Sequence, residues 1–398
     1  MAFSLPFHKA RRHGTLGAGG LAHFVHDGIS DSLYVLLPLW AEAFGLSMAQ
    51  VGLLKTCYSS ALASLQLPLG MLAERWGERA ILAASTVLAG LALTALALAG
   101  GFGTLVAGLI VLGLASSAQH PLASAIVSRG YGTTSRRAAL GTYNFAGDLG
   151  KVAIPPLVAF GAVLFTWQGS VIAYGGLVAL AGLALFVLLG RLGAGQPQMH
   201  HPRSEEPMPR GWGLRQPLGF TLLSSIGVLD IMCRGGFLTF LPFALLAKGA
   251  DIEWVGIALG LVLAGGAAGK LVCGLAAERV GVIRLVLLTE LSTALGIGAL
   301  VLLPLGWSLA ILPAVGLALN GTSSLLYGTV GDFVDPARQS RAFGLFYTLS
   351  LGAGAVSPLL FGMISDATGI NVALLLIASL ALMTLPLALA MRPLLRPG

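Results

Sequence analysis

The sequence predicts an all-α membrane protein in which twelve transmembrane helices form two parallel six-helix repeats. Composition is the first observation behind this prediction, because 56% of the 398 residues are hydrophobic and only 10% are charged. So few polar side chains cannot cover a soluble globule of this size. The second observation is a set of twelve apolar runs, each about as long as the ~20 residues that cross a bilayer as a helix. The third is a motif that occurs twice.

The repeated motif lies where one apolar run ends and the next begins, and matching positions of its two copies are 204 residues apart. The first copy has its glycines and charged residues at Gly70, Glu74, Arg75, Gly77 and Arg79. The second copy has Gly274, Glu278, Arg279 and Gly281 at the positions that match the first four. The same separation relates Pro38 to Pro242, and Arg137 to Arg341. A membrane protein whose halves repeat in parallel follows a common transporter plan.

The first half contains six predicted helices, at 16–40, 49–73, 79–100, 103–128, 137–165 and 169–190. The first helix follows a basic tail, is too long for a signal-peptide core and lacks a small-residue cleavage site, so we expect it to be retained. The second helix ends at the first copy of the motif, where the third begins. Inside the fourth, Pro121 has no backbone N–H, which predicts a kink beside His120.

The second half repeats this arrangement with helices predicted at 216–247, 254–277, 282–304, 307–331, 339–365 and 370–391. Pro242 lies near the end of the seventh helix, as Pro38 does in the first, and the second copy of the motif separates the eighth from the ninth. Residues 191–215, rich in Pro, Gly, His and charge, form the predicted cytoplasmic linker between the halves at 1–190 and 216–398. Two adjacent histidines there, His200 and His201, are more typical of a solvated loop than of a metal site.

The formal net charge of +7 would suit nucleic acid or anionic lipid, so the position of the basic residues decides its meaning. Most of the 23 Lys and Arg residues lie in the two tails and in alternate loops, which indicates topology rather than nucleic-acid binding. The opposite loops carry almost only Glu42, Lys248, Asp251, Glu253 and Asp366. The positive-inside rule therefore predicts a multi-pass protein of the cell (inner) membrane with both termini in the cytoplasm.

Ionisable side chains also lie inside the predicted helices, where a charge is costly unless it faces a wet cavity or a partner. They gather in the first, second, fourth, fifth, seventh and eighth helices, which we therefore expect to surround an aqueous path. The third, sixth and twelfth helices have almost none, so we expect them to face lipid. Glu290 in the ninth helix departs from this pattern, and the sequence gives no account of it.

The duplicated Gly-x-x-Ala-Glu-Arg-x-Gly loops resemble the signature loop of the major facilitator superfamily, and the resemblance extends over essentially the whole chain. It implies two six-helix halves that rock around a central cavity lined mainly by the first, fourth, seventh and tenth helices. Charged residues at these helix ends can pair in one conformation and separate in another, so we expect both loops to gate the cytoplasmic side. Anchoring by the positive-inside rule alone is the alternative.

Two further segments narrow the resemblance. The first helix contains Ala22-His23-Phe-Val-His26-Asp27, and the fourth contains Ser116-Ser117-Ala-Gln119-His120-Pro121. They are similar to segments of the fosmidomycin-resistance group of drug exporters, in which the first helix carries His-x-x-Asn-Asp, and His26 replaces that Asn here. The resemblance implies proton-driven export of a small polar compound.

In the first helix, His23, Asp27 and Asp31 are spaced four residues apart and therefore share one face. A buried carboxylate responds strongly to its surroundings and His titrates near neutrality, so such a cluster is suited to take up and release a proton. We expect Asp27 with His23, supported by His26, Asp31 and His120, to couple protons. A static hydrogen-bonded cluster is the alternative.

Polar and charged side chains in other helices are the candidates for a substrate cavity. They are Lys55, Gln119, Asp148, Lys151, Asp230, Arg234, Lys270, Asn320 and Tyr327. Cations exceed carboxylates in the second, seventh and eighth helices, which favours a ligand carrying negative charge. The pairs Asp148 with Lys151 and Asp230 with Arg234 could instead be internal ion pairs that only neutralise themselves.

These observations predict a secondary active transporter, a proton-coupled antiporter that exports a small anionic or zwitterionic compound or drug. Three alternatives remain open: a proton symporter importing an organic anion, a transport-inactive scaffold or sensor, and a metal-ion exporter with His23, His26, Asp27 and Asp31 as ligands. No ATP-binding loop and no catalytic constellation occurs, so we expect neither an enzyme nor a cofactor. The expected partners are a small-molecule substrate, protons and the lipid bilayer, with no nucleic acid, and we expect a monomer.

Overall fold

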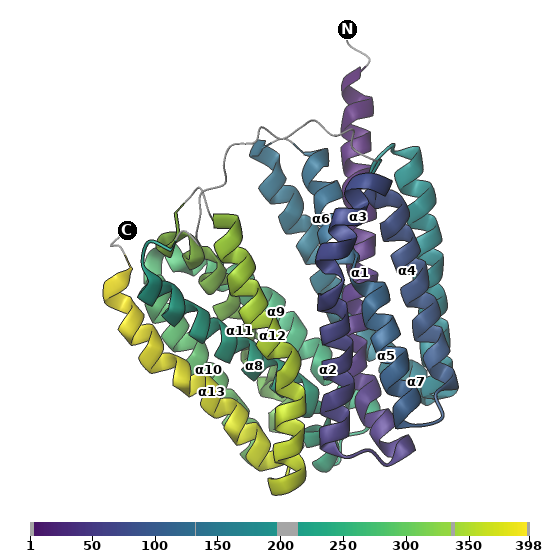
Figure 1. Cartoon of the computed structure of the whole chain (residues 1–398). Helices are drawn as coiled ribbons and strands as arrows, with labels where there is room; N and C mark the ends of the chain where they lie inside the picture. The colour runs from purple at the N-terminus through teal and green to yellow at the C-terminus, as the bar shows by residue number, and fades with distance from the viewer. Residues whose placement is uncertain (1–3, 132, 197–213, 336–338, 396–398) are drawn as a thin grey trace. The chain divides into compact units, whose positions relative to one another are not determined.

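The computed structural model describes residues 4–131, 133–196, 214–335 and 339–395. Within these ranges every regular element is a helix, and Leu214 and Val334 form one isolated antiparallel bridge. Figure 1 shows these helices in chain order. The predicted all-α fold class is confirmed. Most of the predicted linker, including His200 and His201, lies outside the described residues.

The helices of the first half are α1 (Ser4–Phe44), α2 (Met48–Ser64), α3 (Gln66–Trp76), α4 (Glu78–Ala95), η1 (Leu96–Leu98), α5 (Phe102–Ser116), α6 (Gln119–Gly130) and α7 (Thr133–Arg191). Those of the second half are α8 (Pro217–Ala247), α9 (Ile252–Val280), α10 (Val282–Leu302), α11 (Leu305–Thr329), η2 (Val330–Phe333), α12 (Gln339–Thr368), α13 (Ile370–Met391) and η4 (Arg392–Leu394).

Prolines interrupt two of the predicted helices. The helix predicted at 49–73 is divided at Leu65 into α2 and α3, because Pro68 has no N–H for the carbonyl four residues earlier. The predicted fourth helix is likewise divided into α5 and α6, with Pro121 in the first turn of α6, where a missing N–H is tolerated. The predicted kink beside His120 is therefore confirmed, as a short break at Ser117 and Ala118, whose backbone angles stay close to helical values.

Nine helices in the described ranges are long and apolar enough to cross a membrane. One of these nine, α7, contains two of the predicted segments and departs from helical geometry at Thr166, where φ is 68°. The two predicted segments outside the nine are α1, whose buried Asp27 and Asp31 lower its mean hydropathy, and α2, which has 17 residues. Each of the twelve predicted segments thus corresponds to helix in the structure.

The chain divides into two compact units. The N-terminal unit comprises Met1–Gly45 and Cys57–His201, and the C-terminal unit comprises Leu46–Thr56 and Pro202–Gly398. In the N-terminal unit α1 and α4 pack along α7, and in the C-terminal unit α9 packs on α11 while α8 and α10 pack on α13. The beginning of α2 groups with the C-terminal unit because Asp366 accepts hydrogen bonds from the backbone N–H groups of Met48 and Ala49, at 2.8 and 2.9 Å.

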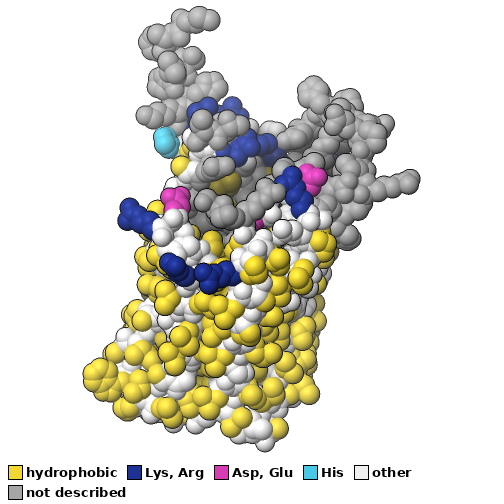
Figure 2. All heavy atoms as spheres, turned by 90° about the vertical axis from the view of Figure 1, so that its left-hand side faces the viewer, with side chains coloured by type: hydrophobic (Ala, Val, Ile, Leu, Met, Phe, Trp, Pro, Cys, Tyr) yellow, Lys and Arg dark blue, Asp and Glu magenta, His cyan; other side chains and the backbone are white. Residues whose placement is uncertain are grey.

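Large apolar side chains cover much of the surface. On the face shown in Figure 2, hydrophobic side chains extend over most of the described area, and Lys and Arg side chains gather toward one end. The helices predicted to face lipid, α4, the last part of α7 and α13, expose Leu88, Leu91, Leu183, Leu375 and Leu382. Such a surface is compatible with acyl chains and is far more apolar than a soluble monomer exposes.

Candidate functional site

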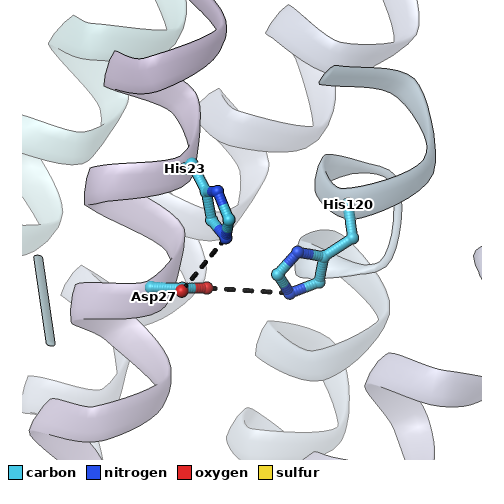
Figure 3. A group of neighbouring side chains, drawn as sticks. All are labelled: His23, Asp27 and His120. Atoms are coloured by element: carbon cyan, nitrogen blue, oxygen red, sulfur yellow. Dashed lines mark ion pairs between the residues drawn. The ribbon is translucent and has the colours of Figure 1, made fainter. Parts of the chain in front are cut away.

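Asp27 lies at the centre of a polar cluster inside the N-terminal unit. Its carboxylate is only 5% exposed, and its Oδ2 lies 3.1 Å from His23 Nε2, one turn earlier on α1. Its Oδ1 lies 3.6 Å from Nε2 of His120, which α6 contributes from the opposite side (Figure 3). The structure therefore brings together three of the residues that the sequence predicts for proton coupling.

Lys151 of α7 completes this cluster. Its ammonium group lies 3.0 Å from Asp27 Oδ2 and also donates a hydrogen bond to Asp148 Oδ1 at 3.3 Å. The predicted pairing of Asp148 with Lys151 is thus present, but Lys151 in addition carries a counter-charge to the buried Asp27. Lys151 and Asp27, which the sequence assigned to separate roles, belong to one electrostatic unit.

Hydrogen bonding fixes where protons lie around His23. Its Nδ1 lies 3.0 Å from the backbone carbonyl of Tyr143, and because a carbonyl only accepts, Nδ1 carries a proton. In a neutral imidazole Nε2 would then also be an acceptor, facing the Asp27 carboxylate 3.1 Å away. His23 can therefore form an ion pair with Asp27 only when Nε2 also carries a proton.

The cluster has a buried side and an accessible side. The side chain of His23 is 7% exposed, whereas that of Lys151 is 28% exposed and that of His120 is 45% exposed. The interruption between α5 and α6 places His120 in the first turn of α6, with Pro121 as its neighbour. His120 and Lys151 are therefore the accessible neighbours of the buried Asp27.

The helical spacing explains why these side chains meet. Tyr143, Gly147 and Lys151 are four residues apart on α7, so they form one face opposite the face of α1 that carries His23 and Asp27. Gly147 permits the close approach, because a Cβ atom there would lie 2.6 Å from His23 Nε2 and 2.7 Å from Asp27 Oδ2. Neither Gly147 nor Tyr143 is among the residues that the sequence predicted for the site.

His26 points to a different neighbour. Its Nε2 lies 3.0 Å from the hydroxyl of Thr86 on α4, and that hydroxyl donates its own proton to the carbonyl of Leu82 at 2.8 Å. The Thr86 oxygen therefore accepts from His26, which places a proton on Nε2 and leaves the buried Nδ1 without a partner. His26 is part of the contact between α1 and α4.

The other predicted residues of this half occupy varied positions. Gln119 is fully buried and donates to the Tyr143 hydroxyl at 3.1 Å, so it supports the ring that lies against His23. Asp31 is buried on α1, one turn beyond Asp27. Lys55 is buried in the part of α2 that belongs to the C-terminal unit.

A metal ion fits this cluster poorly. His23, Asp27 and His120 offer three ligand atoms within 4.8 Å of one another, but the Lys151 ammonium lies 3.0 Å from the same carboxylate. A divalent cation at Asp27 would therefore face a positive charge at close range. The ligand set predicted for a metal exporter also included His26, whose Nε2 is bonded to Thr86. The arrangement is better suited to a proton.

In the C-terminal unit, Arg234 and Asn320 form a second polar contact. Arg234 Nη1 donates to Asn320 Oδ1 at 3.3 Å, and Asp230 accepts from the Ser323 hydroxyl at 3.0 Å. Asp230 and Arg234 form no salt bridge within 4 Å, although both are described. Of the other predicted cavity residues, Tyr327 stacks on Tyr347 with ring centroids 4.9 Å apart, and Lys270 is half-buried on α9.

The two copies of the repeated motif share one backbone feature. Gly77 has a φ of 82° and Gly281 a φ of 88°, so each begins the next helix in a conformation that side chains disfavour. This explains why both copies carry glycine at this position.

The side chains of the two copies differ. Arg79 donates to the carbonyl of Phe186 at 2.9 Å and lies 4.1 Å above its ring, and Glu78 forms an ion pair of 2.5 Å with Arg129. In the second copy Glu278 and Arg279 are exposed. Arg75 is exposed as well, and the side chain of Glu74 lies outside the described residues. The first copy therefore connects α4 to α6 and α7, contacts that the sequence did not predict.

Comparisons with known proteins agree with this architecture. A family model described as Major Facilitator Superfamily matches residues 19–356. The fosmidomycin resistance protein of Escherichia coli is 24% identical, with 94% of this chain and 92% of that protein covered. A probable sulfoacetate transporter of Cupriavidus necator is 26% identical, with 90% and 88% covered. A crystal structure of a bacterial homologue of the human lysosomal transporter Spinster covers 97% of each chain with a TM-score of 0.79 and 17% identity. The chain belongs to the Major Facilitator Superfamily, and it is a membrane transporter rather than an enzyme.

Proposed function

We propose that this transporter is proton-coupled and carries a small anionic or zwitterionic compound. The observation that supports the proposal is the buried carboxyl group of Asp27, with His23, His120 and Lys151 at 3.1, 3.6 and 3.0 Å. A carboxyl group among titratable and cationic neighbours changes its protonation when one of those neighbours moves or binds a ligand. Because His120 is 45% exposed, protons have a route to it.

The ion pair between Asp27 and Lys151 indicates how proton and ligand are coupled. While Asp27 is ionised, the Lys151 ammonium group lies near two carboxylates, those of Asp27 and Asp148. A proton on Asp27 removes one of these negative charges, so Lys151 then attracts an anionic ligand more strongly. Proton and anion therefore favour each other's binding, so symport of an organic anion is our main candidate.

Proton-coupled antiport with export of the compound is the second candidate. It is the function that the sequence predicts, and it is supported by the similarity to a protein named for fosmidomycin resistance over 94% of this chain. In such a cycle proton and ligand occupy the Asp27 cluster alternately instead of together. The two candidates share Asp27 as proton site and differ in the direction of proton flow relative to the ligand.

Reconstituted vesicles with an imposed pH gradient distinguish these cycles. Sulfoacetate and fosmidomycin, the compounds that appear in the names of the two relatives, are suitable first ligands. Symport predicts that ligand and protons move in the same direction, and antiport predicts opposite directions. Asp27→Asn should exchange ligand across the membrane without responding to the pH gradient. A pH gradient that still drives transport in Asp27→Asn contradicts the proposal.

We also propose on which side of the membrane the termini lie and that the transporter is a monomer. Both termini face the cytoplasm, because the loops on that side carry most of the basic residues. The protein lies in the inner membrane as a monomer, and the two motif copies contribute to closing its cytoplasmic side. The ion pair between Glu78 and Arg129 and the contacts of Arg79 support such a role for the first copy.

A further inference from the structure

Arg234 places a positive charge near the middle of a helix that is long and apolar enough to span the membrane. It is partly buried on α8, which extends from Pro217 to Ala247. A guanidinium group at this depth is too far from either end of the helix to reach the interface, so it needs an acceptor within the span. With the offset of 204, Arg234 matches Ser30, three residues after Asp27, so both charged groups lie at a similar level of their helices.

The nearest acid on the same helix does not pair with Arg234. Asp230 lies one turn earlier, but its Oδ2 accepts a hydrogen bond from the Ser323 hydroxyl at 3.0 Å. Arg234 Nη1 donates instead to Oδ1 of Asn320 at 3.3 Å, and this acceptor is a neutral amide. Because a guanidinium group has five N–H donors, the contact with Asn320 uses only one of them.

Asn320 is fixed in the orientation that this contact needs. The residue is 7% exposed, and its Nδ2 donates to the carbonyl of Gly316, one turn earlier on α11, at 3.3 Å. Because the amide nitrogen is used there, the amide oxygen faces Arg234. Gly266 of α9 leaves room for the amide, since a Cβ atom at that position would overlap with the Asn320 side chain. Asn320 therefore holds the guanidinium group without neutralising its charge.

A second cation lies on the same side of α9 as Gly266. Lys270 is one turn beyond this glycine, so it shares the helix face that packs against Asn320, and it is partly buried. Cations of α8 and α9 therefore both lie on the helix faces directed at Asn320 of α11. This arrangement favours an anion over a neutral ligand.

We propose that Arg234, positioned by Asn320, binds the acidic group of the transported compound, a carboxylate, sulfonate or phosphonate, through two of its remaining N–H groups. The planar guanidinium group matches two oxygens of such an acid at once, which a single ammonium charge cannot do. Lys270 adds attraction without providing this geometry. The inference rests on the function proposed above only in that the compound carries negative charge.

Calorimetric titration of the purified full-length protein in lipid nanodiscs, at one fixed pH, tests this site without any gradient. Sulfoacetate, a carboxylate and sulfonate, and fosmidomycin, a phosphonate, are the probes, and at least one should bind to the unmodified protein. Arg234→Gln should weaken that binding about 10- to 100-fold, the usual effect of losing hydrogen bonds to a charged group. Arg234→Lys should give an intermediate affinity, because it keeps the charge and loses the planar donor pair. Arg284→Gln, at an exposed arginine of α10, is the matched control and should not change the affinity.

Variants of Asn320 test its positioning role and keep the test decisive if Arg234→Gln fails to fold. Asn320→Ala removes the acceptor of Arg234 and should weaken anion binding several-fold. Asn320→Asp should weaken it further, although it keeps the size of the side chain, because a carboxylate beside the guanidinium group competes with the ligand. A role of Asn320 in packing alone predicts the opposite order.

Any of three results would overturn the proposal: neither anion binds to the unmodified protein, Arg234→Gln binds as tightly as Arg284→Gln, or Asn320→Asp binds more tightly than Asn320→Ala. The function proposed for Asp27 is tested separately, by the response of transport to a pH gradient. If Asp27→Asn keeps that response while Arg234→Gln loses anion binding, the function proposed for Asp27 fails and this site does not.

Discussion

Asp27 shows how a single buried charge depends on neighbours that are distant in sequence. Its carboxylate contacts a histidine from its own helix, a second histidine from α6 and a lysine from α7. Each neighbour offers a proton or a positive charge, which offsets the cost of removing the carboxylate from water. The same contacts make the protonation of Asp27 sensitive to any movement of Lys151.

Replacing Lys151 should therefore destabilise the N-terminal unit. Lys151→Met leaves the Asp27 carboxylate buried with histidines as its remaining partners, and loss of one member of a buried ion pair costs about 3 kcal/mol. Thermal unfolding in detergent should show a clearly lower midpoint. In Lys151→Met combined with Asp27→Asn part of the loss should be recovered, because Asp27 then carries no charge, while the contact of Lys151 with Asp148 stays lost. A loss in the double variant equal to the sum of the losses in Lys151→Met and Asp27→Asn would show that the pair is not energetically coupled.

Gly147 provides a test of the geometry of the cluster. Gly147→Ala introduces a Cβ atom 2.6 Å from His23 Nε2, so the pairing of His23 with Asp27 must shift. We expect transport driven by a pH gradient to fall at least about tenfold, the effect of a loss of about 1.4 kcal/mol. Gly141→Ala on the same helix is the matched control, because no atom lies within 4 Å of its Cβ. Similar transport rates in both variants would argue against a role for this close contact.

At the scale of elements, the two copies of one motif have different structural roles. In both copies a glycine with positive φ joins two helices, at Gly77 and Gly281. Beyond that shared turn, Arg79 contacts α7, whereas the matching position on α10 is the buried Ile283, and the neighbouring Arg284 is exposed. The repeat thus preserves the backbone and not the side-chain contacts.

This asymmetry predicts unequal effects of alanine substitutions. Arg79→Ala removes a hydrogen bond to the Phe186 carbonyl and a contact with its ring, and should lower stability by about 1–3 kcal/mol. Arg284→Ala should change stability by no more than about 0.5 kcal/mol, the usual range for an exposed site. Thermal unfolding of both variants in the same detergent compares them. A larger loss for Arg284→Ala would contradict the asymmetry.

At the scale of the whole molecule, polar groups are separated from an apolar exterior. The ionisable side chains discussed above lie inside one unit or the other, while leucines cover α4, the end of α7 and α13. Each unit carries its own group of buried titratable side chains, around Asp27 in one and around Asp230 in the other.

The orientation of the whole chain can be tested by cysteine labelling. Asp251→Cys precedes α9 and Arg392→Cys follows α13, and both positions are exposed. The distribution of basic residues predicts that a membrane-impermeant thiol reagent labels intact cells at position 251 and labels position 392 only after permeabilisation. The unmodified chain, with Cys233 and Cys273 buried, gives the background. The reverse pattern would place the termini outside.

By itself the sequence determined the fold class, the positions of the twelve helical segments and the break beside Pro121. These features depend on local properties, namely the length of apolar runs and the missing N–H of proline. It also grouped His23, His26, Asp27, Asp31 and His120, of which the structure brings His23, Asp27 and His120 together. Only the tertiary structure revealed the contacts of Lys151 and Gly147 with this cluster, because their partners lie on other helices. Helical periodicity gives the face on which a side chain lies, whereas packing decides which face lies opposite.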